Sequence, residues 1–442
     1  MKLIYLVLLT GSIWLSIKSN AQNVGIGTTT PNAGLHIVNN NGIVARGTIN
    51  SGAVINETGT GSLFIFNPRK GGAIRAGFLS NTGQNYWNDA STGEYSIGLG
   101  LDAKALASGS TAIGQNTSAN GVNSTAIGFS CSALMPNAIV LSGAGSHAKA
   151  PYSVAIGTDA FANTYGSVAL GININAGSST GSQNAFAIGM GDNPGFISGG
   201  HYASGTRSFA IGNNNQSLGK RSFAIGNDCE SGAFFVNDTK GEYSFALGNA
   251  CKATGNYSFA FGNNANTNLR IGSMVFGSRV DGVAVVSPAD FYFVAQFAGG
   301  YQMQTNNAGT LGVFLNANST SWGSLCDSTK KEQVLPLNDD ETLEKLAAIN
   351  YSSWKYKDDP DATNRHYGIM AQEFYAAFGK DALGNIGNDT IVNPIDLLGI
   401  AYSAIKALEK RTAEIEGLKT ENDLLKARLE KLEALVTRNN KL

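Results

Sequence analysis

A short motif recurs along the chain from Tyr95 to Arg279, and it constrains the possible folds more than any other feature. The motif is a small residue, an apolar residue, Ala, a second apolar residue and Gly, as in SFAIG at 222–226. Its base interval is about 14 residues, with longer insertions between some copies. Self-similarity at a fixed period indicates stacked repeats that contact only their neighbours. About 14 residues are too few for two helices but enough for two short strands and two turns, so the motif predicts a β-roll or β-helix.

Alternation along each strand predicts that the two faces of the roll differ. Phe223 and Ile225 are expected on one face, and Ser222 and Ala224 on the other. The closing Gly allows a positive φ or a close backbone approach at each corner. Composition agrees with a folded, turn-rich chain. Hydrophobic residues make up 43%, too many for a disordered chain, and the 55 glycines follow no Gly-X-Y triplet of the collagen type.

The repeat strings carry a family resemblance. STAIG (124–128), SVAIG (153–157), SFAIG (208–212 and 222–226) and SFALG (244–248) resemble the head repeat of trimeric autotransporter adhesins. The resemblance implies a left-handed parallel β-roll with three chains side by side; the period alone does not give the number three. The C-terminal part of the chain departs from that family's pattern.

Two insertions in the repeat, Gly191–Arg207 and Glu230–Glu242, are the candidates for a binding surface. Loops on a rigid scaffold often carry recognition. The insertions contain two pairs of residues of interest, His201 with Tyr202 and Phe234 with Phe235, although such residues more often serve local packing.

The first 21 residues predict export. Lys2 gives a positive start, Leu3–Ile17 is nearly all apolar, and Ala21 is a small residue suited to cleavage, which is typical of a secretory signal peptide. The alternative is an uncleaved membrane anchor, but the apolar run is short for a span. We therefore expect a secreted protein, extracellular or at the cell surface, with no transmembrane segment in the mature chain. A net charge of -1 argues against a nucleic-acid partner.

The sequence predicts a mostly β protein of several parts. These are a signal peptide (1–21), an N-terminal β cap (22–94), the β-roll head (95–279), a β neck (280–325) that resembles those of phage-type tail fibres, an α+β domain (326–400) and a coiled coil (401–442). The last part has a heptad pattern, which predicts self-association. Its core positions are Ile415, Leu418, Asn422, Leu425, Leu429, Leu432 and Val436.

A second resemblance begins at Cys326, where Lys, Glu and Leu replace Gly, Asn and Ser. The run from Cys326-Asp327 to Lys331, the later His-Tyr-Gly-Ile-Met-Ala-Gln-Glu (366–373) and the terminal coiled coil resemble the endosialidase-type intramolecular chaperone, a self-cleaving domain of trimeric fibres. The resemblance implies that Cys326 occupies the position of the nucleophilic Ser and that Lys331 is the general base. It places the scissile bond at Leu325–Cys326 and implies a catalytic role for His366, with Asp327 and Gln372 in support.

The exchange of Ser for Cys leaves two outcomes open. A thiol ionises more readily than a hydroxyl, and a nearby ammonium favours the thiolate. A Lys that acts as a base must, however, be neutral, which requires desolvation. The domain therefore either cleaves itself once or stays attached as a permanent trimerisation module.

The remaining cysteines, Cys131, Cys229 and Cys251, are interpreted as small residues packed in the repeat rather than as a disulfide framework. We expect no metal and no cofactor, because no close ligand pair is present and the Gly-x-Gly strings are repeat corners.

The favoured function is a secreted, fibrous, adhesin-like homotrimer that binds matrix, glycan or another cell-surface ligand. The alternatives are an uncleaved structural trimer and a glycan-acting enzyme. The enzyme is disfavoured because the acidic residues of the repeat are scattered rather than paired.

Overall fold

A computed structural model of the chain describes residues 23–38, 42–177, 183–191, 201–231, 241–357 and 364–439. The expected signal peptide and most of both insertions, including Phe234 and Phe235, lie outside the described residues. The chain divides into two compact units, Met1–Tyr301 with Leu315–Ser321, and Gln302–Phe314 with Trp322–Leu442. Each unit is described by itself.

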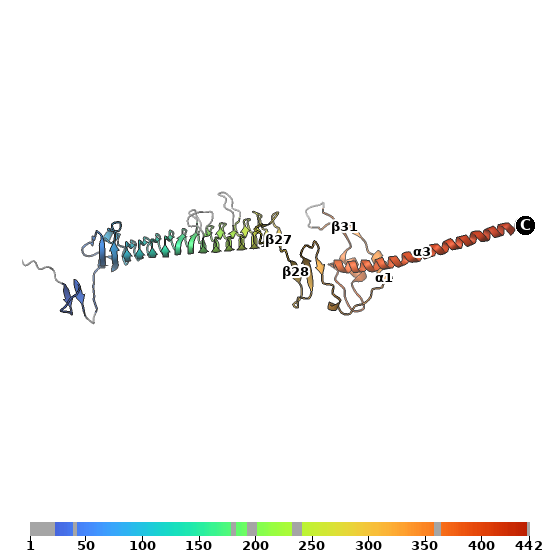
Figure 1. Cartoon of the computed structure of the whole chain (residues 1–442), viewed down its shortest axis with the longest axis horizontal. Coiled ribbons are helices and arrows are strands. Elements are labelled where there is room, and N and C mark those ends of the chain that lie inside the picture. The colour runs from blue at the N-terminus through green and yellow to red at the C-terminus, as the bar shows by residue number, and fades with distance from the viewer. Residues whose placement is uncertain are drawn as a thin grey trace, which may run out of the picture. The chain divides into compact units, whose positions relative to one another are not determined.

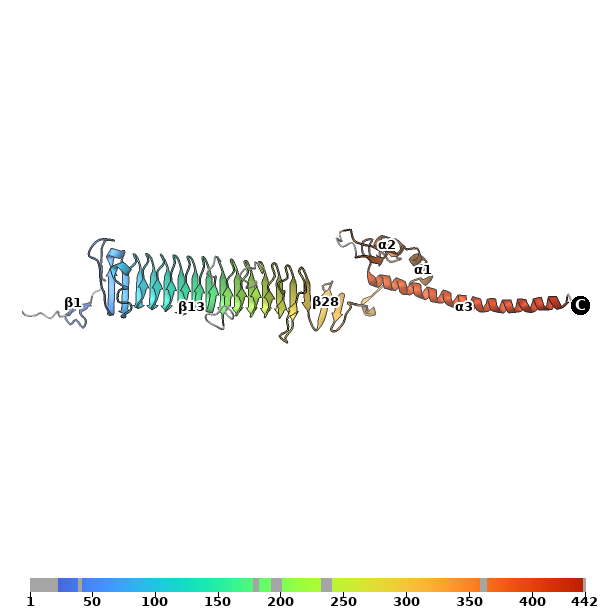
Figure 2. The same ribbon diagram turned by 90° about the horizontal axis from the view of Figure 1, so that it is seen from above.

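The first unit is built around a stack of parallel strands (Figures 1 and 2). A typical rung has a five-residue strand, such as β19 (Phe223–Asn227), and a two-residue strand, such as β20 (Glu230–Ser231). Each strand pairs in parallel with its counterpart in the next rung, so that Ala224 lies opposite Ala246 and Gly226 opposite Gly248. This arrangement confirms the predicted parallel β-roll.

The strands keep the same order along the roll. The long strands are β5 (Ile97–Leu101), β7 (Thr111–Gln115), β9 (Thr125–Phe129), β11 (Ile139–Ala144), β13 (Val154–Ala162), β14 (Val168–Ala176), β15 (Phe186–Met190), β17 (Phe209–Asn213), β19, β21 (Phe245–Asn249), β23 (Phe259–Asn263), β25 (Met274–Ser278) and β27 (Phe293–Gln296). The short strands are β6 (Lys104–Ala105), β8 (Ser118–Ala119), β10 (Ser132–Ala133), β12 (His147–Ala148), β16 (His201–Ala203), β18 (Gln216–Ser217), β20, β22 (Lys252–Ala253), β24 (Ala265–Asn266) and β26 (Val285–Val286).

Small side chains fill the interior of the roll. Ala112, Ala126, Ala224 and Ala246 are fully buried, and so is Ser222. Phe223, by contrast, points outward and is 39% exposed. The predicted alternation is thus confirmed, and the phenylalanines of the repeat lie outside the single-chain roll, whereas Val140 and Ile174 are among the few larger apolar residues in its core.

The outward residues form a continuous surface, called the apolar face below. Its aromatic rings stack from rung to rung, with centroids 4.7 to 5.8 Å apart. The rings belong to Phe186, Phe209, Phe223, Phe245, Phe259, Phe276 and Phe293. Ile113, Ile127, Ile156, Leu170, Ile188, Ile211, Ile225, Leu247 and Phe261 continue this face along the roll.

The closing glycines are required by close packing between rungs. Gly226 has a φ of +127°, and a Cβ atom there would lie 1.9 Å from the carbonyl oxygen of Gly248. A side chain at this corner would therefore force neighbouring rungs apart.

Polar side chains inside the roll bond to these glycine carbonyls. Asn215 Nδ2 donates to Gly226 O at 2.8 Å, and Cys229 Sγ donates to Gly248 O at 3.1 Å. His201, singled out in the sequence as part of an insertion, lies instead in strand β16 with its side chain fully buried, and its Nε2 lies 3.1 Å from Ala210 O.

A different arrangement caps the N-terminal end. Strands β1 (Val24–Ile26) and β2 (Leu35–Ile37) form a small parallel pair. Strands β3 (Gly61–Asn67) and β4 (Ala73–Leu79) are antiparallel, and β4 then pairs in parallel with β5. The short helices η1 (Pro68–Lys70) and η2 (Asp89–Ser91) complete the cap.

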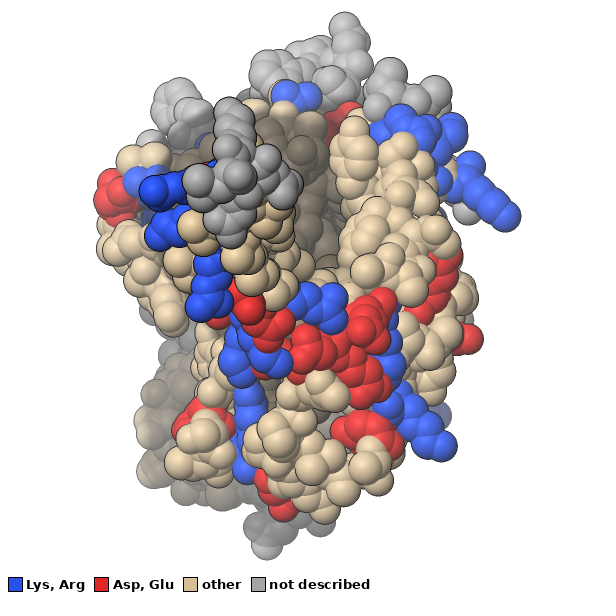
Figure 3. Space-filling view, turned by 90° about the vertical axis from the view of Figure 1, so that its right-hand side faces the viewer, with Lys and Arg blue, Asp and Glu red and all other residues tan. Residues whose placement is uncertain are grey.

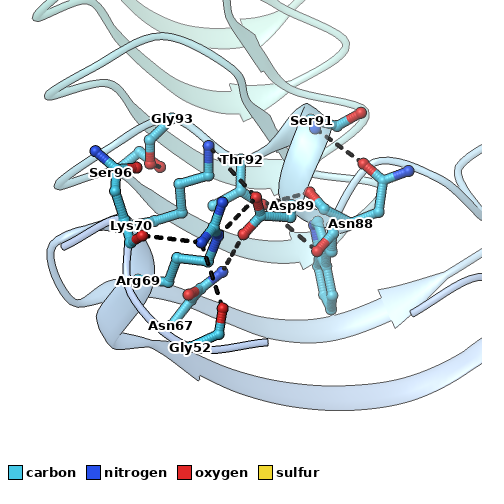
Figure 4. A network of polar contacts seen from close by, with 12 residues as sticks. Gly52, Asn67, Arg69, Lys70, Asn88, Asp89, Ser91, Thr92, Gly93 and Ser96 are labelled. Atoms are coloured by element: carbon cyan, nitrogen blue, oxygen red, sulfur yellow. Dashed lines mark hydrogen bonds and ion pairs between the residues drawn. The ribbon is translucent and has the colours of Figure 1, made fainter. Parts of the chain in front are cut away.

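Two polar groups hold this cap together. The buried Asp89 carboxylate accepts a hydrogen bond from Asn67 and forms ion pairs with Arg69 at 3.4 Å and Lys70 at 3.7 Å (Figure 4). The buried Arg75 guanidinium donates to Ser96 Oγ at 2.9 Å and to Ala105 O at 2.7 Å. Among the described residues no carboxylate pairs with Arg75, and burial lowers its pKa to about 10.

At the other end, the parallel ladder continues past Arg279 to β27, so β4 to β27 form one sheet. Strands β28 (Gly300–Gln304), β29 (Gly312–Asn316) and β30 (Gly323–Ser324) form a separate small sheet, in which β29 and β30 are antiparallel.

The second unit contains three helices and a strand pair. The helices are α1 (Asp339–Ala347), α2 (Ala371–Phe378) and α3 (Pro394–Asn439), and the strands are β31 (Ser352–Trp354) and β32 (His366–Gly368). The start of α1 binds α3 through ion pairs from Asp339 to Lys406 at 2.7 Å and from Asp340 to Lys410 at 3.3 Å. Figure 3 shows acidic and basic side chains beside one another rather than in regions of one sign.

The C-terminal part of α3 exposes the predicted heptad residues. Leu418 is 64% exposed and Val436 is 59% exposed, and Ile415, Leu425, Leu429 and Leu432 are exposed as well. Of the helices that the structure describes, none combines the length and the apolar character needed to cross a membrane.

Candidate self-processing site

A tight turn follows Cys326 and forms the centre of the candidate site. The carboxylate of Asp327 accepts a hydrogen bond from the backbone N–H of Thr329 at 2.9 Å, which caps the short helix η3 (Ser328–Lys330). The backbone N–H groups of Lys330 and Lys331 donate to the carbonyl oxygens of Asp327 and Ser328. An Asp in this position favours such a turn because its short side chain satisfies a backbone donor that would otherwise be unpaired.

The turn brings the two predicted catalytic side chains together. Lys331 Nζ lies 3.0 Å from Cys326 Sγ, although the residues are five positions apart in the chain. A hydrogen bond from an ammonium group stabilises a thiolate, because it is assisted by the opposite charges. The predicted spacing from nucleophile to lysine therefore corresponds to direct contact.

Exposure sets the electrostatics of this pair. Cys326 and Lys331 are both exposed in the single chain, so the desolvation that a neutral lysine base requires is not provided there. The hydrogen bonds from Thr329 to the Asp327 carboxylate lower the pKa of that carboxyl. Asp327 therefore stays ionised and keeps its capping role down to acidic pH.

The other predicted residues lie elsewhere in the same unit. His366 starts β32 and packs against the rings of Trp354 at 4.8 Å and Tyr356 at 5.6 Å. Among the described residues, no contact joins His366 to Cys326 or Lys331. Gln372 lies in the first turn of α2. Leu325, which precedes Cys326, is 38% exposed just after β30.

The sequence did not identify two features of this unit, which are the partner of Glu373 and an aromatic cluster. Glu373 holds Asn350 by two bonds, accepting from its backbone N–H at 2.9 Å and from its side-chain Nδ2 at 3.2 Å. Trp354, Tyr356 and His366 form one aromatic cluster. The pairing of β31 with β32 creates this cluster, and no local sequence pattern indicates which strands pair.

Comparison with known families gives two matches. Residues 326–383 match the model of the family described as chaperone of endosialidase. The YadA head domain repeat matches in five segments, 91–117, 105–130, 143–173, 203–228 and 240–265. Comparison with curated proteins gives no match. The chain therefore combines matches to the YadA head repeat, within residues 91–265, with a match to the chaperone of endosialidase over residues 326–383.

Proposed function

We propose that this protein is an exported, adhesin-like homotrimeric fibre whose C-terminal domain aligns three copies and then cleaves itself off before Cys326. The observation that carries the proposal is the apolar face of the roll. Its interior is already closed by alanines, yet Phe223 and Phe261 are each 39% exposed and Phe293 is 66% exposed. Contiguous apolar surfaces of this length mark protein interfaces in soluble proteins.

The regularity of the apolar face favours copies of the same chain as its partners. Each rung presents one or two large apolar side chains at the same place, so a second roll in the same register meets an equivalent residue at every rung. Full burial of one such side chain stabilises an assembly by about 1.5 to 3 kcal/mol, and every rung of the stack adds a similar contribution. The number three comes from the family resemblance.

The exposed heptad of α3 supports an order of assembly. A three-stranded coiled coil would bury Leu418, Leu425 and their equivalents, and it would raise the local concentration of the three heads. Long-range β pairing is slow and leaves strand edges exposed, so alignment before stacking protects the chain from wrong pairing. Removal of the chaperone after assembly would leave a kinetically trapped fibre.

The contact between Cys326 and Lys331 supports self-cleavage. In this reaction the Cys326 thiolate attacks the carbonyl carbon of Leu325, the Leu325–Cys326 C–N bond breaks, and the amine of Cys326 takes up a proton. Water then hydrolyses the Leu325 thioester, which gives a Leu325 carboxylate and returns the thiol. The Lys331 ammonium would hold the thiolate and supply the proton to the departing amine. Burial of this pair in a trimer would strengthen both effects.

The test of cleavage is the intact mass of residues 22–442, compared with the variants Cys326→Ala, Cys326→Ser and Lys331→Ala. We expect two fragments from the parent, split before Cys326, and uncut chains from Cys326→Ala and Lys331→Ala. Cys326→Ser should retain cleavage, because it restores the nucleophile of the family. A single uncut parent chain would contradict self-processing and leave a permanent trimerisation domain.

The test of assembly is the molar mass of the same chain by light scattering. We expect three copies. A double substitution, Leu418→Asp with Leu425→Asp, should lower the yield of trimer, whereas Glu421→Lys, outside the heptad core, should not. A monomeric parent chain would refute the trimer whatever the outcome of the cleavage test.

A further inference from the structure

Cys229 and Cys251 occupy the same position in two consecutive rungs. Glu230 pairs with Lys252 in the parallel register, and the backbone N–H of Glu230 donates to Cys251 O at 2.7 Å. The preceding residues, Cys229 and Cys251, are therefore neighbours across the rungs, although residues 230–250 separate them in the chain. Adjacent strands lie about 4.8 Å apart, within the Cα separation of about 4.4 to 6.8 Å that a disulfide spans.

The two thiols also point to the same place. Both side chains face the interior, and Cys229 and Cys251 are 1% and 0% exposed. Cys229 Sγ donates to Gly248 O at 3.1 Å and Cys251 Sγ to Gly262 O at 3.2 Å, and the two thiols are close enough to shift each other's pKa. Bond formation between them needs rotation of the side chains and no change in the register of the rungs.

A cavity on the surface of the roll lies beside one of these two residues. Cys229 lines a cavity of about 200 Å³ together with Asn214, Gln216, Asp228, Glu230 and Lys252. The Lys252 ammonium lies 3.3 Å from the Glu230 carboxylate in the wall of this cavity. The Cys229 thiol itself is 1% exposed, so a reactant reaches it before the rungs close over it.

We propose that Cys229 and Cys251 are a disulfide site that links two rungs of the exported head. The oxidant is a disulfide donor, either a thiol–disulfide oxidoreductase or a small disulfide such as oxidised glutathione. Cys229 loses its proton and attacks one donor sulfur, which releases one thiol and leaves a mixed disulfide. Cys251 then attacks Cys229 Sγ, which releases the second thiol. Two cysteine thiols and one donor disulfide thus become one cystine and two donor thiols.

Burial sets the timing of this reaction. The neighbouring Cys229 thiol and burial raise the pKa of Cys251, so its thiolate is scarce in the finished roll. Exchange should therefore be fastest while the rungs are still assembling. The disulfide closes a loop of the chain that contains residues 232–240, the centre of the second insertion. Closing a loop in this way restricts the unfolded chain and so stabilises the folded roll.

Cys131 is the matched control within the chain. It lies in the same column of the roll, but the flanking rungs place Thr117 and Ser146 at its position. Its thiol is buried and has no cysteine in either neighbouring rung. If oxidation depended only on how buried a thiol is, Cys131 would be oxidised as readily as Cys229 and Cys251.

The experiment uses the full chain exported into an oxidising compartment, denatured with iodoacetamide present and digested without reductant. We expect one peptide pair linked through Cys229 and Cys251, lighter by two hydrogen atoms than the sum of its parts, with Cys131 alkylated. Alkylated Cys229 and Cys251, both after export and after refolding with oxidised glutathione, would overturn the proposal.

A second measurement connects the bond to stability. Reductant should lower the apparent unfolding temperature of the parent and of Cys131→Ser by several degrees. It should leave the double variant Cys229→Ser with Cys251→Ser unchanged. An equal response of all three proteins to reductant would show that this pair does not link the rungs.

Discussion

Substitution of Gly226 by Ala tests the central feature of the roll, the close approach of consecutive rungs. The new Cβ would lie 1.9 Å from Gly248 O, a backbone atom that cannot move without displacing its rung. The φ of +127° costs an L residue about 1 to 3 kcal/mol. Loss of one hydrogen bond between rungs adds about 1 kcal/mol. We therefore expect a destabilisation of about 2 to 4 kcal/mol.

The matched control is Gly282→Ala. Gly282 also has a positive φ, of +76°, but nothing lies within 4 Å of a Cβ built on it. It carries the backbone strain alone, about 1 kcal/mol. The difference between the two variants therefore measures the clash between rungs together with any extra strain at the φ of Gly226.

Hydrogen exchange is the suitable assay, because a stacked protein opens locally and each rung depends on its neighbours. Amides of β19 and β21 should exchange at least 10-fold faster in Gly226→Ala than in the parent, since 1.4 kcal/mol corresponds to a factor of about 10. Amides of β5 and β7, far along the stack, should be unchanged. Equal exchange of β19 and β21 in Gly226→Ala and Gly282→Ala would refute the reasoning.

Three further predictions concern single side chains. Asp327→Ala should slow cleavage before Cys326, because the turn loses its cap. Asp327→Asn can accept the same hydrogen bond and should largely retain the cleavage rate. Equal cleavage rates of the two variants, measured by intact mass, would contradict this role of Asp327. Arg75→Ala should destabilise the first rungs by about 3 kcal/mol, since it leaves a cavity and unpaired carbonyl groups; exchange of β4 and β5 amides checks this, with the exposed Arg46→Ala as control. The Lys406 ammonium lowers the pKa of Asp339 in the folded chain. The Asp339 carboxylate therefore stabilises the α1–α3 contact at pH values above its unfolded pKa of about 3.9. This stabilisation is lost as the pH falls through the lower pKa of the folded chain. Protection of α1 amides should fall over that range in the parent and show less pH dependence in Asp339→Asn.

Different interactions stabilise the roll and the C-terminal unit. Burial of the small alanine side chains contributes little hydrophobic stabilisation to the roll. Its stability therefore depends on the stacking of rungs and on what covers the apolar face. The buried Arg75 fills the interior at the first rung and satisfies carbonyl groups that would otherwise face an open end. The C-terminal unit exposes its heptad, and ion pairs join α1 to α3. Both units therefore leave apolar surface exposed in the single chain.

The sequence alone determined the period of the roll, its strands and the heptad pattern of the C-terminal helix. These features follow from local patterns, because alternation, glycine spacing and heptad spacing act over a few residues. The i, i+5 spacing of Cys326 and Lys331 was equally visible, and the family resemblance gave it a meaning. Alternation also showed that Phe223 and Ala224 lie on opposite faces of a strand.

Only the tertiary structure decided which of those faces is inside. Alternation does not distinguish the inner face from the outer face, so the choice depends on how narrow the roll is. The two strands of a rung lie so close that the interior has room for Ala224 but not for Phe223. The same holds for Cys229 and Cys251, because insertions of unequal length hide their equivalence until the rungs are stacked in register. Contact between residues distant in the chain is set by this long-range pairing, which no local pattern encodes.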